Sequence, residues 1–126
     1  MRIHHIAITV NNLEESQKFY QDFFNFKVVE FFKREDMSAK FVHLELDGFI
    51  IELWEFAGIK ENSDNLKDIK IRGIRHIAFG VENLDKIFSD FRQRGLEITE
   101  PKLGASGHIY SFISDPNGVA LEIYQM

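Results

Sequence analysis

Two segments of the sequence resemble each other and occur twice in the same order, and this repetition constrains the fold more than any other feature. Residues 3–13 (IHHIAITVNNL) match residues 74–84 (IRHIAFGVENL), and residues 47–54 (DGFIIELW) match residues 117–124 (NGVALEIY). The offset between the copies changes by only one residue from the first match to the second. Short apolar strands can resemble each other by chance, but two matches in one order indicate two copies of a single structural unit.

Each copy is predicted to form a strand, a helix and three further strands. Residues 3–10 are rich in β-branched side chains in an alternating pattern, which predicts the first strand. Asn11 or Asn12 can cap the helix that follows. The apolar faces expected for the two helices consist of Leu13, Tyr20, Phe23 and Phe24, and of Leu84, Ile87, Phe88 and Phe91. The further strands are expected at residues 26–33, 41–46 and 49–56, and at residues 96–99, 109–114 and 119–125.

Turn sequences support this division of the chain. Asp47-Gly48 is typical of a tight hairpin, and residues 115–118 (DPNG) are typical of a turn that ends on glycine. Residues 58–73 are polar and charged, which indicates a linker between the copies. We therefore predict one α+β domain over residues 1–126, built from βαβββ repeats at 1–57 and 74–126.

The composition excludes several classes of function. The sequence has no cysteine, so disulfides, thiolate catalysis and cysteine-ligated zinc are ruled out. The formal net charge of −5 argues against nucleic-acid binding and against binding to a membrane surface. The first ten residues lack the apolar run of a signal peptide, and acidic residues interrupt the apolar stretch 41–59. We therefore expect a cytoplasmic protein with neither a nucleic-acid nor a membrane partner.

One histidine and one glutamate of each copy are expected to lie in mid-strand, on the sheet face away from the helix. Side chains of a strand alternate between its two faces, so Ile6, Ile8 and Val10 share the face under the helix, and His5 takes the other face. The same reasoning applies to the other three residues, Glu52, His76 and Glu122.

These four residues suit a divalent metal ion. A buried carboxylate must be paired or protonated, and two glutamates together with a dication are neutral. Two imidazoles and two carboxylates suit nickel, cobalt, zinc, iron or manganese. Taken singly, His5 fits an ordinary core or edge histidine, and either glutamate fits a solvent-facing position on an antiparallel sheet. The occurrence of all four at matching positions of a repeat favours the metal site.

The sequence resembles the vicinal oxygen chelate superfamily, and within it glyoxalase I (lactoylglutathione lyase). The resemblance covers nearly the whole chain and rests on HIAITVNNLEESQKFYQDFF, IELWE, HIAFGVENL and FISDPNGVALEIY. It implies the glyoxalase/bleomycin-resistance/dihydroxybiphenyl dioxygenase fold, a cupped mixed sheet around one divalent metal ion, with nickel or cobalt favoured. By position, the metal ligands implied are His5, Glu52, His76 and Glu122.

The resemblance also implies a reaction and an assembly. Two neighbouring oxygens of a small-molecule substrate chelate the metal, which stabilises an enediolate, and Glu122 is the implied base that moves the proton between adjacent carbons. A homodimer is expected, in which each cup is built either within one chain or from two chains. Glyoxalase I grips glutathione with an arginine where this sequence has Thr9, and with an asparagine in the region that here reads Trp54-Glu55-Phe56-Ala57. These departures argue against glutathione hemithioacetal as the substrate.

Two other functions remain open on the sequence. The first is an epimerase resembling methylmalonyl-CoA epimerase, in which a glutamate near the position of Glu35 takes part, although such enzymes often carry glutamine at the position of Glu52. The second is a non-catalytic protein that binds small molecules or drugs. The complete set of four ligands favours an enzyme over this second function. The sequence does not assign a face of the sheet to His43.

Overall fold

The structure, a computed structural model, describes residues 1–61 and 67–126. The chain divides into two compact units, Met1–Asn62 and Ser63–Met126, and each unit is described by itself. Part of the expected linker, residues 62–66, lies outside the described residues.

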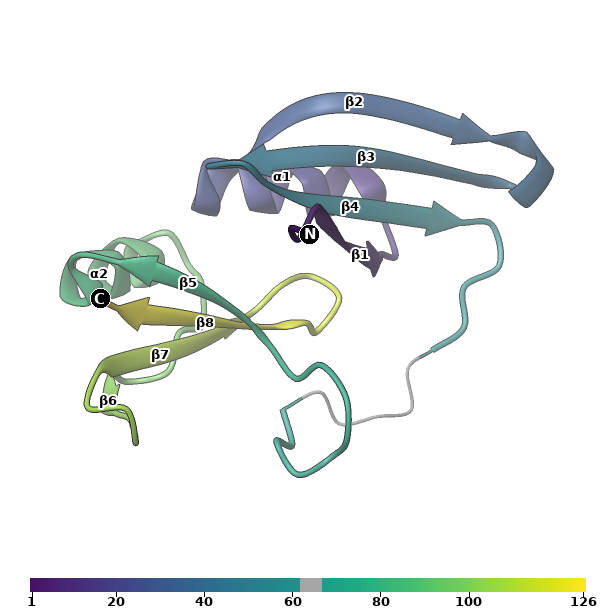
Figure 1. Cartoon of the computed structure of the whole chain (residues 1–126). Helices are drawn as coiled ribbons and strands as arrows, with labels where there is room; N and C mark the ends of the chain where they lie inside the picture. The colour runs from purple at the N-terminus through teal and green to yellow at the C-terminus, as the bar shows by residue number, and fades with distance from the viewer. Residues whose placement is uncertain (62–66) are drawn as a thin grey trace. The chain divides into compact units, whose positions relative to one another are not determined.

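The first unit has the predicted order of one strand, one helix and three strands (Figure 1). Its elements are β1 (His5–Thr9), α1 (Leu13–Phe24), β2 (Lys27–Arg34), the short 3-10 helix η1 (Glu35–Met37), β3 (Ala39–Leu46) and β4 (Phe49–Phe56). The strands form a sheet in the order β1-β4-β3-β2, in which β1 runs parallel to β4 and the other neighbours are antiparallel. Helix α1 packs on β3 and β4, so one face of the sheet is left for other contacts.

The second unit repeats this topology. Its elements are β5 (Ile77–Val81), α2 (Leu84–Gln93), β6 (Lys102–Leu103), β7 (Ile109–Ser114) and β8 (Ala120–Gln125). The strand order is β5-β8-β7-β6, with β5 parallel to β8, and helix α2 packs on β7 and β8. The tandem βαβββ fold predicted from the repeat is therefore confirmed.

One predicted strand is wrong. Residues 96–99 do not form a strand, and the edge strand of the second sheet is β6, which begins at Lys102. Thr99 makes an isolated contact with β7 through two hydrogen bonds: its N–H donates to the Phe112 carbonyl, and the Phe112 N–H donates to its hydroxyl. Pro101 comes between this contact and β6, and because proline has no N–H it interrupts the ladder of hydrogen bonds.

The repeat extends to the hydrogen bonds that hold each helix against its sheet. Asn12 caps α1 by accepting from the Glu15 N–H, and Asn83 caps α2 by accepting from the Lys86 N–H. The first N–H of α1 donates to the Glu55 carboxylate of β4 at 2.6 Å. The first N–H of α2 donates to the Gln125 side chain of β8 at 3.1 Å. Each helix therefore begins at a fixed point beside the last strand of its own unit.

Alternation along the strands separates the core from the opposite face. Ile51, Leu53, Leu121 and Ile123 are at most 1% exposed, and they lie on the face covered by the helices. The predicted helix faces are only partly buried. Of the predicted face of α1, Leu13, Tyr20 and Phe24 are buried and Phe23 is half-buried, and Phe19, which was not predicted, is buried as well. On α2 the middle of the stripe, Ile87 and Phe88, is half-buried.

Both predicted turns are present. Asp47 and Gly48 take positive φ values of 50° and 81°, which suits a two-residue hairpin loop between β3 and β4. Before β8, the Asp115 carboxylate accepts from the Asn117 and Val119 N–H groups, which closes the turn. These turns fix the register of the strands that carry the candidate ligands.

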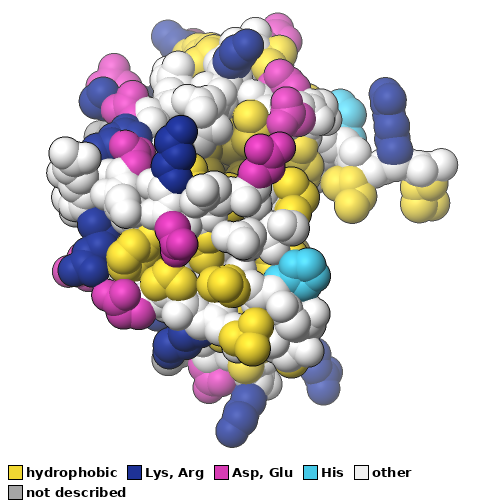
Figure 2. Space-filling view, turned by 90° about the vertical axis from the view of Figure 1, so that its left-hand side faces the viewer, with side chains coloured by type: hydrophobic (Ala, Val, Ile, Leu, Met, Phe, Trp, Pro, Cys, Tyr) yellow, Lys and Arg dark blue, Asp and Glu magenta, His cyan; other side chains and the backbone are white. Residues whose placement is uncertain are grey.

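The surface is mixed in character. On the face seen in Figure 2, acidic and basic side chains are interspersed, and hydrophobic side chains reach the surface between them. Within the described residues, no helix has the length and apolar character needed to cross a membrane.

Candidate metal centre

In the first unit, His5 and Glu52 lie on the same sheet face, opposite the helix. Strands β1 and β4 are parallel, with Ala7 beside Glu52. His5 is two residues from Ala7 on the same strand, so its side chain shares the face of Glu52. Electrostatic attraction from His5 acts on the Glu52 carboxyl and favours its charged form. The sequence prediction that these two residues share a face is therefore supported.

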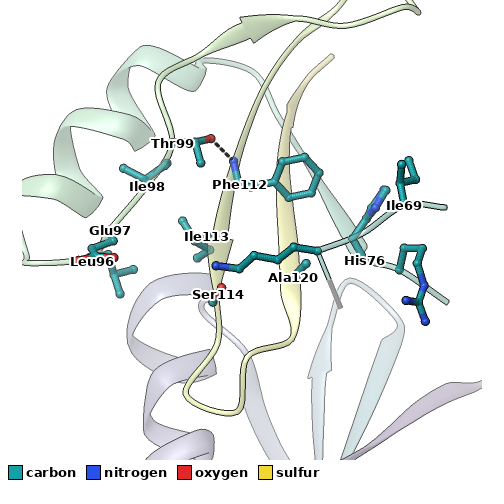
Figure 3. A pocket seen from close by; sticks show the side chains of 12 residues that line it. Ile69, His76, Leu96, Glu97, Ile98, Thr99, Phe112, Ile113, Ser114 and Ala120 are labelled. Atoms are coloured by element: carbon teal, nitrogen blue, oxygen red, sulfur yellow. Dashed lines mark hydrogen bonds between the residues drawn. The ribbon is translucent and has the colours of Figure 1, made fainter. Parts of the chain in front are cut away.

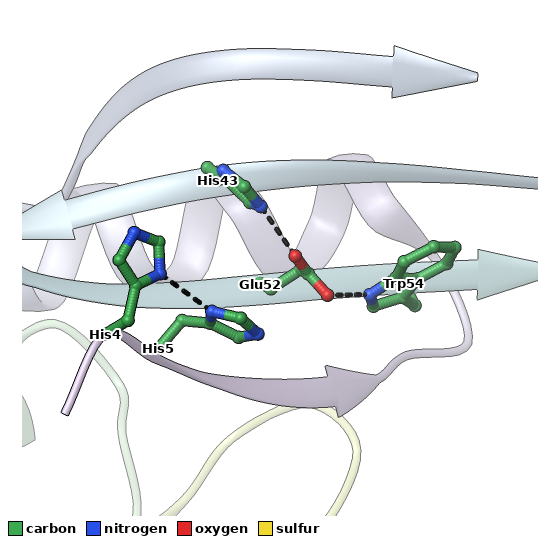
Figure 4. Close-up of polar contacts among 5 residues, drawn as sticks. All are labelled: His4, His5, His43, Glu52 and Trp54. Atoms are coloured by element: carbon green, nitrogen blue, oxygen red, sulfur yellow. Dashed lines mark hydrogen bonds and ion pairs between the residues drawn. The ribbon is translucent and has the colours of Figure 1, made fainter. Parts of the chain in front are cut away.

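A third histidine belongs to this face. His43 of β3 lies directly across from Glu52, and its Nε2 donates to Glu52 Oε2 at 2.6 Å (Figure 4). The other carboxylate oxygen of Glu52 accepts from the indole N–H of Trp54. The His5 and His43 rings are stacked with centroids 6.2 Å apart. His4 Nδ1 lies 2.9 Å from His5 Nδ1, so one of these two nitrogens carries the shared proton. Both oxygens of Glu52 thus have a protein partner.

The surroundings of Glu52 keep it ionised. Burial alone would raise its pKa, but the hydrogen bonds from Trp54 and His43 and the attraction of His5 and His43 act in the other direction. The net result is a Glu52 pKa below its ordinary value of 4.5. A carboxylate that stays ionised suits a metal ligand.

In the second unit, His76 and Glu122 occupy the matching positions. The two histidines do not lie in mid-strand as predicted, because His5 is the first residue of β1 and His76 directly precedes β5. Ala78 lies beside Glu122 just as Ala7 lies beside Glu52. His76 Nε2 lies 3.2 Å from Glu122 Oε2. Two ligands of one metal ion, each roughly 2.1 Å from it at a right angle, lie roughly 3 Å apart. The donor atoms of this pair therefore fit two neighbouring positions around a divalent cation.

The two glutamates have unequal neighbours. The position of His43 is taken in the second unit by Phe112, which lies across from Glu122. The centroid of its ring lies 5.4 Å from that of the His76 ring, edge to face. The position of Trp54 is taken by Tyr124, whose hydroxyl pairs with Ser106 Oγ at 3.1 Å. The side chains that hold Glu52 on two sides thus have no counterpart at Glu122.

Each unit contributes one imidazole and one carboxylate of the predicted set. Among residues 1–61 and 67–126, no three His, Asp or Glu side chains converge closely enough to hold a metal ion by themselves. Glu35, which the sequence left open, lies in η1 with an exposed side chain. His43 was likewise left open, and the structure places it on the face of Glu52.

Beside Glu52, aromatic rings form a stacked row. The Phe41 and Trp54 rings lie 4.0 Å apart, Phe32 stacks on Phe41 at 4.4 Å, and Phe56 stacks on Trp54 at 5.4 Å. All four rings are half-buried and lie on the face that carries Glu52. This face of the first unit therefore combines a charged centre with an apolar wall.

The second unit contains a cavity of about 720 Å³ beside its His–Glu pair. His76, Phe112, Ser114 and Ala120 line one part of it, and the segment Leu96–Thr99 lines another (Figure 3). Phe112, Ser114 and Ala120 lie on the same sheet face as Glu122. The cavity is thus lined by one candidate ligand, His76, and by residues that share a sheet face with the other, Glu122.

Comparison with known proteins adds independent information. The pattern of the Glyoxalase/Bleomycin resistance protein/Dioxygenase superfamily matches residues 2–123. The uncharacterized protein YwkD of Bacillus subtilis (strain 168) is 34% identical over 126 residues, which cover 98% of this chain and 95% of that protein. The mitochondrial methylmalonyl-CoA epimerase of Bos taurus is 29% identical over 133 residues, covering 98% of this chain and 74% of the relative.

A solved structure shows the same fold. The trypanothione-dependent glyoxalase I of Leishmania major superposes with a TM-score of 0.78 at 26% identity, covering 99% of this chain and 86% of that one. Proteins with two different reactions in their names, an epimerase matched by sequence and a glyoxalase I matched by structure, are thus similar to this chain over nearly its whole length.

Proposed function

The chain belongs to the glyoxalase/bleomycin resistance protein/dioxygenase superfamily, and from that premise we propose that it is a metal-dependent lyase or isomerase of the glyoxalase I type. It moves a proton between adjacent carbons of a small substrate that carries two neighbouring oxygens. The proposal rests on the two His–Glu pairs, His5 with Glu52 and His76 with Glu122, and on the different neighbours of the two glutamates.

The proposed ligands of a divalent cation are His5, Glu52, His76 and Glu122, contributed either by one chain or by two chains. Two imidazoles and two carboxylates are a donor set that nickel, cobalt, zinc, iron and manganese accept. When bound, the cation polarises neighbouring substrate oxygens and stabilises the negative charge that develops on them. All further steps fall to the side chains of the chain itself.

The observation that carries the proposal is that Glu52 and Glu122 differ in the side chains that pair with their carboxylate oxygens. Hydrogen bonds from His43 and Trp54 hold both oxygens of Glu52, so this carboxylate is fixed and ionised. Glu122 faces His76, and its cross-strand neighbour Phe112 offers no hydrogen bond. A carboxylate with fewer partners can turn toward a substrate and exchange a proton. Glu122 is therefore the proposed base, and Glu52 a static ligand.

An epimerase is the second candidate function. The observation in its favour is the similarity to bovine methylmalonyl-CoA epimerase over 98% of this chain. Both reactions begin when a base removes a proton from a carbon next to a carbonyl group, so the role of Glu122 serves either one. The two functions differ in the substrate that the cavity accepts.

The test combines metal content with two matched substitutions. We expect purified protein, reconstituted in turn with nickel, cobalt, manganese and zinc, to hold about one ion per chain. Both Glu52→Gln and Glu122→Gln should weaken metal binding. At saturating metal, Glu122→Gln should abolish turnover and the exchange of the substrate's carbon-bound proton with deuterated solvent. Glu52→Gln should keep measurable exchange under the same conditions.

The test uses two substrates, each assayed by proton NMR. One is methylmalonyl-CoA, and the other is the hemithioacetal of methylglyoxal with glutathione, against which Thr9 and residues 54–57 argue. Turnover of one and not the other separates the two candidate functions. Undiminished exchange by Glu122→Gln would remove this residue as the base. Failure of all four metals to bind stoichiometrically would overturn the proposed metal-dependent activity and indicate a non-catalytic ligand-binding protein.

A further inference from the structure

The cavity of the second unit has cationic side chains in its wall that the proposed function does not use. Arg75 and Lys67 line it together with His76. Arg75 and His76 both line this cavity, so a ligand that Arg75 holds there shares the cavity with a candidate metal ligand. The hydroxyl-bearing side chains Thr99 and Ser114 line the same cavity, and Figure 3 shows both of them there.

The Arg75 guanidinium is buried in part without a partner. Its Nε and Nη1 atoms are inaccessible to solvent, and neither has a hydrogen-bond partner among the described residues. Arginine stays protonated and presents five donors in a rigid fork, so leaving these donors unpaired is costly. Arg75 lines the cavity, and when its guanidinium turns toward that space an anionic oxygen group with two acceptors satisfies these donors best.

The local backbone fits closely around this side chain. A Cβ atom added at Gly73 would lie 3.2 Å from Arg75 Nη2, and the Gly73 φ of 130° is unfavourable for other residues. Glycine thus lets the chain pass near the guanidinium without filling the space beside it. Among the described residues that line the cavity, Glu97 is the one carboxylate, and it lies with Leu96 on the side away from His76 in Figure 3.

We propose that Arg75 binds an anionic oxygen group, a carboxylate or a phosphate, on the substrate of the neighbouring metal centre. Identification of the ligand as substrate rests on the proposed function, whereas the anion site itself does not. The substrate class is then a small oxygenated compound with an anionic group near its reacting carbons. The guanidinium fork orients that group and so places the reacting carbon beside His76 and Glu122.

The test is an anion titration of the metal-free protein, followed by 1H–15N NMR. Metal is removed by dialysis against a chelator and then against chelator-free buffer. Succinate and inorganic phosphate are titrated in separate arms. We expect saturable shifts at the amides of residues 75, 76, 99 and 114 with one of the two anions. A response to succinate assigns a carboxylate-bearing substrate, and a response to phosphate assigns a phosphate ester.

Three variants make the result specific. Arg75→Gln should weaken binding of the anion by about tenfold or more, since it removes a charge-assisted pair of hydrogen bonds. Arg75→Lys keeps the charge without the fork and should give an intermediate affinity. Arg72→Gln, an exposed position in the same segment, is the matched control and should bind like the wild type. The NMR spectra themselves report whether each variant is folded.

The inference is overturned if folded Arg75→Gln binds the anion as tightly as the wild type, or if neither anion gives saturable shifts at the cavity. Because the titration contains no metal, its failure is distinct from failure of the proposed function. A protein that binds the anion through Arg75 but takes up no metal would keep the site and refute the metal centre. A protein that takes up metal but does not bind the anion through Arg75 would keep the metal centre and refute the anion site.

Discussion

His43 Nε2 lies 2.6 Å from Glu52 Oε2, across the neighbouring strands β3 and β4. Both side chains are mostly shielded from solvent, with 19% and 13% of their surfaces exposed. In the second unit the equivalent cross-strand pair is Phe112 and Glu122. The two halves of the chain thus share a backbone design but hold their carboxylates differently.

Removing the His43 imidazole should weaken metal binding. A side chain that donates a hydrogen bond to a metal ligand orients that ligand, and its loss costs about 10–100-fold in metal affinity. We expect His43→Phe to reduce the affinity for divalent cobalt by that factor, measured by calorimetry and by the absorption spectrum of bound cobalt. His43→Gln can still donate to Glu52 and should recover part of the loss. His108, an exposed histidine of the second unit whose ring pairs with the Gln125 carbonyl, supplies the control variant His108→Gln. An unchanged cobalt affinity in folded His43→Phe would contradict the positioning role.

The reciprocal substitution tests the freedom of Glu122. Phe112→His places an imidazole across from Glu122 in the arrangement that His43 has with Glu52. We expect slower proton transfer with retained metal binding, because the new hydrogen bond stabilises the ionised carboxylate and makes it a poorer base. The checks are solvent deuterium exchange at saturating metal and thermal unfolding of the variant. Wild-type exchange rates in a folded variant would show that Glu122 is not the group that limits the reaction.

The lowered pKa of Glu52 predicts the acid stability of the metal-free protein. A carboxyl whose folded pKa lies below its unfolded value stabilises the fold above the unfolded value and loses that contribution as the pH falls through the folded pKa. We expect unfolding free energy to decline as the pH is lowered below 4.5, the ordinary pKa of this group. Glu52→Gln should flatten this part of the profile, measured by denaturant titration. An identical slope in the variant would contradict the assignment.

The buried side chains of β4, Ile51 and Leu53, should contribute strongly to the unfolding free energy of the first unit. Leu53 is 0% exposed and pairs beside Ile8 under helix α1. Leu53→Ala is expected to cost about 2–5 kcal/mol of unfolding free energy, because a cavity remains where the side chain was removed. Leu103→Ala, at a position 74% exposed, is the control and should change stability by less than about 0.5 kcal/mol. Both values come from urea denaturation followed by circular dichroism.

Much of this arrangement could be predicted from the sequence, since strand periodicity and turn chemistry are local. The alternation around His5 and Glu52 assigns their face, and Asp47-Gly48 specifies a two-residue hairpin. Counting outward from that hairpin pairs Leu46 with Phe49 and then His43 with Glu52, as observed. The face of His43 was therefore readable from the turn, although periodicity on its own strand left it open.

Other features depend on contacts that no local pattern encodes. Residues 96–99 have the apolar character of a strand, yet Pro101 and the paired Thr99 hydrogen bonds replace the ladder. The unpaired guanidinium atoms of Arg75 arise from packing around the side chain, and the sequence shows only an arginine before a histidine. The four residues proposed as metal ligands come from the repeat, and the proposed roles of their glutamates come from the neighbours that the structure supplies.

Trp54 is the one tryptophan of the sequence. Its indole N–H donates to Glu52, and its ring stacks on Phe41. Indole emission responds to nearby charge, so the intrinsic fluorescence of the unlabelled protein should change when Glu52 is neutralised or bound. Ultraviolet excitation therefore gives a direct optical signal from this carboxylate, with a time resolution that allows stopped-flow measurements.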